Sequence, residues 1–230
     1  METKEEDKKE ENALSKHFFS AYFRRFDKNL STPNHLPAGL YVMPVVNNLY
    51  EWYGVIFIHR GYYKEGVFKF KLTIPESYPL EGPKINFITD MFHPLISTNF
   101  DREFSLKQQF SKWRPQKDFI CHVLHYLKNC FKEAVLSNLQ EQYCLNKEAY
   151  SMFFTEREAF AKLAGQCAQL SSSPDTLFDN ESLDANCSLL FTKLSDDEYE
   201  NIRENLLKEE NNEVKFVDTE QTSVPTSIFE

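Results

Sequence analysis

The sequence lacks long hydrophobic runs: nowhere do about 18 apolar residues follow one another, so no transmembrane helix is expected. Basic residues are outnumbered, with 26 Lys and Arg against 35 Asp and Glu, which gives a formal net charge of −9. Clustered positive charge is what displaces phosphate counterions and holds anionic lipids, so neither nucleic-acid binding nor electrostatic membrane attachment is expected. Other proteins are the expected macromolecular partners.

Cysteine is scarce and unevenly placed. The chain has 5 cysteines, none of them between Met1 and Phe119, and their spacing shows no paired zinc-ligand pattern. They are Cys121, Cys130, Cys144, Cys167 and Cys187. We therefore expect no metal and no other cofactor. The charged residues 1–10 lead into no apolar signal core, so reduced thiols and a cytoplasmic location are expected.

Aromatic residues are abundant. The 21 Phe, 11 Tyr and 2 Trp are ample for a hydrophobic core in a chain of 230 residues, and Trp52 and Trp113 are expected to pack in it. We expect a charged segment over residues 1–11, one domain over 12–170, and an extension over 171–230 that is partly helical and then disordered.

Alternation of apolar and polar residues predicts four strands. They are Leu40–Val46, Tyr50–His59, Gly66–Ile74 and Ile85–Ile88. In Gly66–Ile74 the apolar residues occupy one face of the strand while Lys69 and Lys71 occupy the other. Turn residues between the first three segments favour hairpins, so the sequence predicts a four-stranded antiparallel meander.

Helical periodicity marks four further segments. They are Asn12–Asn29, residues 119–131 with Asp118 as the candidate N-cap, Asn146–Gln169, and Ser195–Glu210. Ser195 and Glu198 match the capping-box pattern, which strengthens the last of these. A meander flanked by helices predicts an α+β fold with the sheet packed against helices, followed by a helical or disordered C-terminal extension.

Proline recurs between Pro75 and Pro115 at intervals that exclude a continuous helix. An irregular segment of this kind between regular elements is where a functional site is expected. Its marker residues are Pro75, Tyr78, Pro79, Pro83, His93, Pro94, Trp113 and Pro115.

Together with Trp52 and Gly66-Val67-Phe68, these markers resemble the ubiquitin-conjugating enzyme family over about residues 12–165. Active members have Asn after His-Pro and a nucleophilic Cys about ten residues beyond the His; here those positions fall at Leu95 and at Glu103 or Phe104. A ubiquitin thioester needs a thiolate, and lysine attack on it needs an oxyanion donor. None of the three residues supplies either group, so the resemblance implies a catalytically inactive variant.

Among inactive relatives, the chain resembles the Fused Toes family, which includes crossbronx-like proteins. The resemblance is carried by Gly39-Leu40-Tyr41-Val42, Trp52–Ile58, Phe92-His93-Pro94-Leu95 and Leu177-Phe178-Asp179. It implies an adaptor that joins a Hook-type coiled-coil protein and a companion subunit in a vesicle-transport complex.

Three alternatives stay open. A non-catalytic member of the ubiquitin pathway would bind ubiquitin or an active conjugating enzyme. An RWD-type binding domain would also carry the pattern Tyr78-Pro79 with Pro83, although His93-Pro94 and Trp113-x-Pro115 argue against it. An atypical conjugating enzyme would use Cys121 as its nucleophile, but Cys121 follows Trp113-x-Pro115 and falls inside a predicted helix.

Other candidate chemistry has a plainer interpretation. His93 is read as a structural residue of its turn in preference to a catalytic base. Cys121 with His125, four residues apart on a predicted helix, offers two metal ligands without a second pair, so a polar surface patch is expected. Asp101 with Glu103 is read as a solvated loop.

Overall fold

The structure is a computed structural model that describes residues 36–45, 48–179 and 189–205. The chain divides into two compact units, one ending at Leu190 and the other beginning at Phe191. The helix predicted over residues 12–29 lies outside the described residues. Within the described ranges, no helix is long and apolar enough to cross a membrane.

Four strands form one antiparallel sheet in the order β1-β2-β3-β4, which confirms the predicted meander. Their bounds are β1 Leu40–Val45, β2 Asn48–Phe57, β3 Val67–Thr73 and β4 Lys84–Phe87. Phe70 of β3 lies opposite Gly54 of β2. A Cβ at Gly54 would lie 2.2 Å from the Phe70 ring, so the ring can pack over this position only because residue 54 is glycine.

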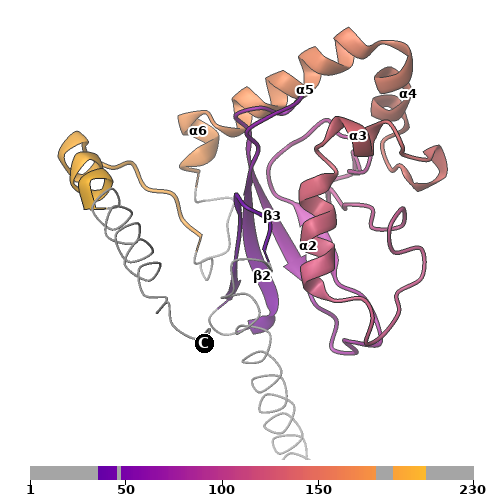
Figure 1. The fold of residues 1–230 in the computed structure, drawn as a ribbon. Helices are drawn as coiled ribbons and strands as arrows, with labels where there is room; N and C mark the ends of the chain where they lie inside the picture. The colour runs from indigo at the N-terminus through magenta and orange to yellow at the C-terminus, as the bar shows by residue number, and fades with distance from the viewer. Residues whose placement is uncertain (1–35, 46–47, 180–188, 206–230) are drawn as a thin grey trace, which may run out of the picture. The chain divides into compact units, whose positions relative to one another are not determined.

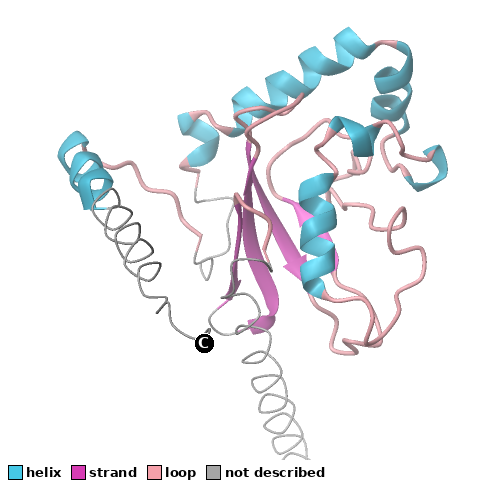
Figure 2. Cartoon of the chain, viewed as in Figure 1, coloured by secondary structure: helices cyan, strands magenta, loops and turns pink. Residues whose placement is uncertain are grey.

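The helices follow the sheet in the chain (Figures 1 and 2). They are α2 Ile120–Asn129, α3 Glu133–Leu136, the 3₁₀ helix η1 Glu141–Tyr143, α4 Lys147–Thr155, α5 Arg157–Ser171 and α6 Pro174–Leu177. In Figure 1, α2 lies beside the sheet, and α5 runs past the end where β2 turns into β3. A bond from the Val67 amide to the Ser171 hydroxyl, 2.9 Å long, fixes α5 at that end.

Two predictions about helices are wrong in detail. Asp118 does not cap α2: the N-cap is Phe119, and the Asp118 carboxylate accepts from the backbone and guanidinium of Arg114 instead. The helix expected from Asn146 to Gln169 is two helices, because Glu156 leaves the helical region with φ −135° and ψ 59°. The second helix, α5, ends at Ser171, two residues beyond the predicted end at Gln169.

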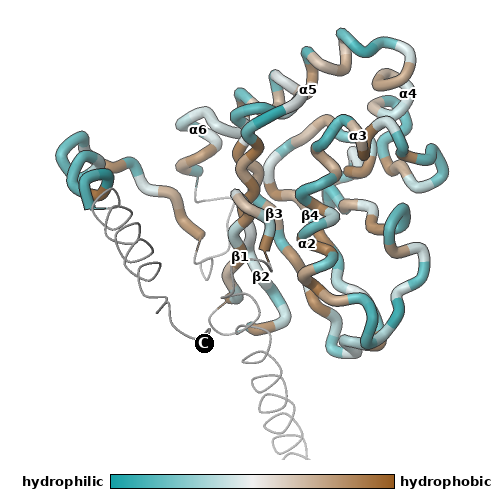
Figure 3. The backbone as a smooth tube through the Cα atoms, viewed as in Figure 1, coloured by the Kyte–Doolittle hydropathy of each residue, from teal (hydrophilic) through white to brown (hydrophobic). Residues whose placement is uncertain are grey.

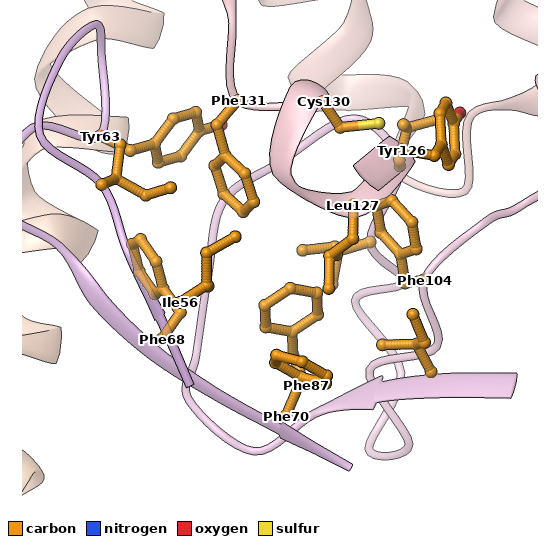
Figure 4. Close-up of a cluster of buried hydrophobic side chains, with 14 of the residues drawn as sticks. Ile56, Tyr63, Phe68, Phe70, Phe87, Phe104, Tyr126, Leu127, Cys130 and Phe131 are labelled. Atoms are coloured by element: carbon orange, nitrogen blue, oxygen red, sulfur yellow. The ribbon is translucent and has the colours of Figure 1, made fainter. Parts of the chain in front are cut away.

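The core lies between the sheet and α2 and is rich in aromatic rings (Figure 4). Phe68 of β3 stacks on Phe131 with ring centroids 5.9 Å apart, and Tyr63 meets Phe131 edge-on at 5.3 Å. Trp52, 1 % exposed, packs in this core as predicted, and Trp113 packs against it while partly exposed. Burying rings of this size supplies most of the driving force for the domain.

The outer face of the sheet is covered in part by the chain beyond α5. Lys69 projects from β3 on this face, yet it is only 5 % exposed. Its ammonium donates to the backbone carbonyls of Thr176, Leu177 and Asp179 at 3.4, 2.8 and 3.3 Å. These carbonyls lie at the end of α6, where unpaired acceptors and the helix dipole favour a cation.

The second unit contains a helix over residues 196–205, whose residues are exposed and mainly hydrophilic (Figure 3). The predicted capping box is confirmed. The Ser195 amide and hydroxyl both donate to the Glu198 carboxylate, at 2.9 and 2.8 Å, and the Glu198 amide donates back to the Ser195 hydroxyl.

Candidate functional site

His93 is fully buried and binds two backbone groups. Its Nδ1 accepts from the Leu95 amide at 3.1 Å, and its Nε2 lies 3.2 Å from the Cys130 carbonyl oxygen. Because Nδ1 is an acceptor, the ring proton is on Nε2, which donates to that carbonyl. Burial lowers the pKa of His93 to about 4, against the opposing effect of the Cys130 bond, so the ring is neutral near pH 7.

The segment after His93 folds back on itself. Ile96 pairs with Phe104, and the Ser97 amide donates to the Glu103 carbonyl at 2.9 Å. Phe104 in turn donates its amide to Ile85 of β4 at 2.8 Å, so the returning arm extends the sheet. Glu103 and Phe104 therefore lie on a strand-like arm, which is hydrogen-bonded to the segment after His93 on one side and to β4 on the other.

The side chains at the candidate positions differ in exposure. Leu95 is 0 % exposed and Phe104 is 2 % exposed, so both are part of the core. Glu103 is exposed. The structure thus brings Leu95 and Phe104 together in the core beneath the loop, while Glu103 faces solvent.

Ser105 is a residue that the sequence reasoning missed. Its amide donates to the Leu95 carbonyl at 2.8 Å, so it is Ser105 that bonds directly to Leu95 from the returning arm. Its side chain is 4 % exposed, and its hydroxyl has no hydrogen-bond partner among the described residues. A count of residues from His93 could not have found it, because spacing along the chain does not determine where a loop returns to the sheet.

Three of the marker residues, Tyr78, Pro79 and Trp113, lie together. The Trp113 indole donates to the Pro79 carbonyl at 2.8 Å, and its ring centroid lies 6.2 Å from that of Tyr78. A Cβ at Gly82 would lie 2.7 Å from the Trp113 ring. Pro83 is buried, Pro75 is half-buried and accepts from the Tyr78 amide, and Pro115 is exposed.

Burial governs the described cysteines. Cys130 touches His93 only through its backbone carbonyl; its side chain is in the core, and burial strongly raises the pKa of its thiol. Burial also raises the pKa of Cys144, to about 11, and the pKa values of Cys121 and Cys167. Reactive cysteines need the opposite shift. Cys187 lies outside the described residues.

Cys121 lies in the first turn of α2, whereas His93 bonds to the residue just beyond the end of α2. Nine residues of helix separate the two points by roughly 13 Å along the axis. His122, beside Cys121, accepts from the Phe119 amide at 3.4 Å. Within the described ranges, no group of three His, Cys, Asp or Glu is placed to hold a metal ion.

A cavity of about 510 Å³ is lined by residues of α2, α3 and the segment from Gln108 to Asp118, among them His122 and His125. His93, Leu95, Glu103 and Phe104 are not among its lining residues. This cavity is therefore separate from the candidate site beside the His93 turn.

The meander, the helix that follows it and the buried His-Pro turn define a ubiquitin-conjugating-enzyme-like domain. The family model described as ubiquitin-conjugating enzyme matches residues 25–168, and the chain belongs to this family. Its curated relatives carry the names of the Fused Toes family. The Danio rerio AKT-interacting protein is 32 % identical over 191 residues, covering 82 % of this chain and 62 % of the relative.

Two other relatives show the same relationship. The Nematostella vectensis protein AKTIP homolog is 32 % identical over 152 residues, 65 % of this chain and 48 % of the relative. The Anopheles gambiae protein crossbronx homolog is 30 % identical over 134 residues, 57 % of this chain and 58 % of the relative. The chain thus spans between about half and two thirds of the length of these relatives.

Proposed function

We propose that this chain is a catalytically inactive ubiquitin-conjugating-enzyme-like domain that acts as a protein-binding adaptor. The observation that carries the proposal is the set of side chains at the His93 turn. Leu95, Phe104 and Ser105 are buried, and Glu103 is exposed. None of them has a thiol, so these positions offer no sulfur on which a ubiquitin thioester can form.

The neighbouring groups support the same conclusion. Both nitrogens of His93 are engaged with backbone, so the ring is not free to take a proton from a nucleophile. Leu95 has no side-chain donor for an oxyanion, and losing one such donor typically costs about a hundredfold or more in rate. What remains is a rigid surface suited to recognition.

Within this proposal the chain is cytoplasmic and binds a Hook-type coiled-coil protein and a companion subunit in a vesicle-transport complex. The family relationship supports an adaptor role, because the relatives are named for an interaction and not for an activity. The name AKT-interacting protein states an interaction with AKT, which makes AKT a further partner to test with this chain.

Affinity purification of the full chain from its native cells, read by mass spectrometry, tests the adaptor role. We expect stoichiometric recovery of a coiled-coil protein and a companion subunit. A matched sample, carrying an equally tagged active conjugating enzyme, controls for proteins that bind this fold in general. Recovery of no partner beyond the control would contradict the proposal.

A non-catalytic role in the ubiquitin pathway is the second candidate, supported by family membership. It predicts that the chain retains ubiquitin, or a conjugating enzyme charged with ubiquitin, in a pull-down from purified components. The adaptor proposal predicts no such retention.

An enzyme that uses Cys121 is the third candidate. Burial raises the pKa of this thiol, which lowers the fraction present as thiolate, and the thiol is far along α2 from the His93 turn. The candidate predicts a reducible ubiquitin adduct that Cys121→Ser abolishes.

A further inference from the structure

A second cavity, of about 350 Å³, lies on the part of the domain where the chain enters β1, β2 ends and α2 ends. We propose that it docks a segment of a partner protein in which an Asp or Glu stands close to a large apolar side chain. The inference rests on the proposed adaptor function and gives it one docking site. The lining residues are Ala38, Ile58, His59, Arg60, Gly61, Lys128, Phe131, Lys132 and Glu133.

The rim of this cavity carries excess positive charge. Arg60, Lys128 and Lys132 line it, against a single carboxylate, that of Glu133. Glu133 already accepts from Arg157 at 2.7 Å and from the Tyr62 hydroxyl at 3.1 Å, so much of its charge is neutralised. In a chain of net charge −9, a cavity with this local balance is complementary to an acidic ligand.

Lys128 is less exposed than Arg60 and Lys132. Its ammonium donates to the Phe57 carbonyl, and an ammonium has three donors, so two remain for a ligand. Burial, and secondly the charge of Lys132, lower the pKa of Lys128, which means that the described surroundings do not fully compensate its charge. A carboxylate placed beside both lysines would relieve that repulsion.

Beside this cavity, the backbone of Gly39 lies close to Lys128 and His59, and also to the Phe57 carbonyl oxygen. A Cβ built on Gly39 would lie 3.2 Å from Lys128 Nζ and 3.4 Å from His59 Nε2, so two basic groups converge on one point of the backbone. Gly39 has φ +73°, a conformation that side-chain-bearing residues rarely adopt. Glycine at this turn therefore avoids placing a side chain against Lys128 and His59.

The floor of the cavity is apolar. Ile58 and Phe131 are 5 % and 3 % exposed and belong to the core, while Ala38 is exposed at the edge. An apolar side chain of the ligand gains burial on this floor, and its acidic neighbour reaches the rim. Charge complementarity and the apolar floor together favour a mixed acidic and apolar protein segment as the occupant.

Selection of short random peptides displayed on phage, with the full chain as bait, tests this inference. We expect the enriched peptides to share an acidic residue within one helical turn of Leu, Ile, Phe or Trp. The double variant Arg60→Glu, Lys132→Glu should weaken their binding about tenfold or more. Both side chains are exposed, so the variant keeps the fold.

Two controls make the result specific. Lys84→Glu changes the charge by the same sign at an exposed residue outside the cavity lining and should leave binding unchanged. Replacing the acidic peptide residue by Lys should restore binding to the double variant. Peptides without an acidic residue, or equal loss in the double variant and in Lys84→Glu, would overturn the docking site.

The same double variant separates this inference from the adaptor function. If it still recovers every partner in affinity purification, the docking site is wrong and the adaptor function stands. If the wild-type chain recovers no partner at all, the adaptor function fails, and the docking inference, which rests on it, fails with it.

Discussion

At the scale of single residues, His93 connects two parts of the domain by backbone bonds alone. Its ring accepts from the Leu95 amide and donates to the carbonyl of Cys130, just beyond the end of α2. A neutral, buried imidazole in this role contributes to stability only as long as it stays neutral. Protonation of His93 should therefore appear as a pH dependence of the free energy of unfolding.

The pKa of His93 is about 4 in the folded chain against 6.5 for the ordinary side chain, so the unfolded state binds the proton first as the pH falls. The contribution of His93 is fully present above pH 6.5 and is lost between pH 6.5 and about 4. The loss amounts to about 3 kcal/mol. Urea unfolding at several pH values measures it.

His93→Asn is the matched control, because its side-chain oxygen can accept from the Leu95 amide and does not titrate. The free energies of unfolding of the two proteins should converge as the pH falls through this window. Parallel pH profiles would show that His93 does not titrate as its burial requires.

The burial of Ser105 indicates how accessible the groove beside Leu95 is. Its hydroxyl is buried beside Leu95, so a nucleophile at this position would be withheld from a large substrate. A thiol placed there should be equally inaccessible, since cysteine and serine differ by one atom.

In Ser105→Cys, we expect the new thiol to react with iodoacetamide at least about tenfold more slowly than Cys121, because it is buried and its thiolate is disfavoured. Peptide-level mass spectrometry of the native protein measures both rates in the same sample. Equal rates would mean that the groove beside Leu95 is open.

At the scale of elements, α6 and the residues after it are tied to the sheet by one buried ammonium. Lys69 donates to the carbonyls of Thr176, Leu177 and Asp179. This contact turns the outer face of β3 from a solvated surface into a covered one.

Lys69→Met keeps the aliphatic stem and removes the ammonium, so carbonyls at the end of α6 lose a charged donor. We expect the free energy of unfolding to fall by about 2 kcal/mol. Hydrogen exchange in residues 174–179 should also accelerate. Thermal or urea unfolding and exchange mass spectrometry measure the two effects.

Lys71→Met, on the same face of β3, is the control. Lys71 pairs with Glu51 at 3.0 Å, with side chains 28 % and 31 % exposed, and a pair of this kind contributes less than about 1 kcal/mol. Equal losses in the two variants would contradict the role given to Lys69.

The strands could be predicted from the sequence because alternation of apolar and polar residues is a local property of each segment. The break at Glu156 could not, since neither proline nor glycine marks it and the apolar residues Phe153 and Phe160 continue on one side. Asp118 failed as a cap because Arg114 competes for its carboxylate through both backbone and side chain. Local rules give way where a nearby charge offers a stronger partner.

The candidate site could be predicted only in part from the sequence. His93 and Leu95 follow from the motif, whereas Ser105 depends on how the loop returns to the sheet, which spacing does not determine. The Lys69 contacts and the basic cavity lined by Arg60 and Lys128 join residues distant in sequence, and no pattern in the chain marks them.

At the scale of the whole molecule, the chain keeps the architecture of its family in the unit that ends at Leu190. The features on which the proposed inactivity rests are local: a buried Leu95, a buried Ser105 and an exposed Glu103. A fold can keep its shape after such changes, because side chains at a site contribute less to stability than the core does. This is the physical basis for expecting binding without turnover.

The most direct test of the account is ubiquitin loading. The purified full chain is incubated with activating enzyme, ATP and ubiquitin, beside an active conjugating enzyme as positive control and Cys121→Ser as the matched variant. Intact mass spectrometry without reductant then reads every adduct. The account predicts no ubiquitin adduct on the chain or on its variant, while the control loads fully. An adduct on the wild-type chain that reductant removes would contradict it.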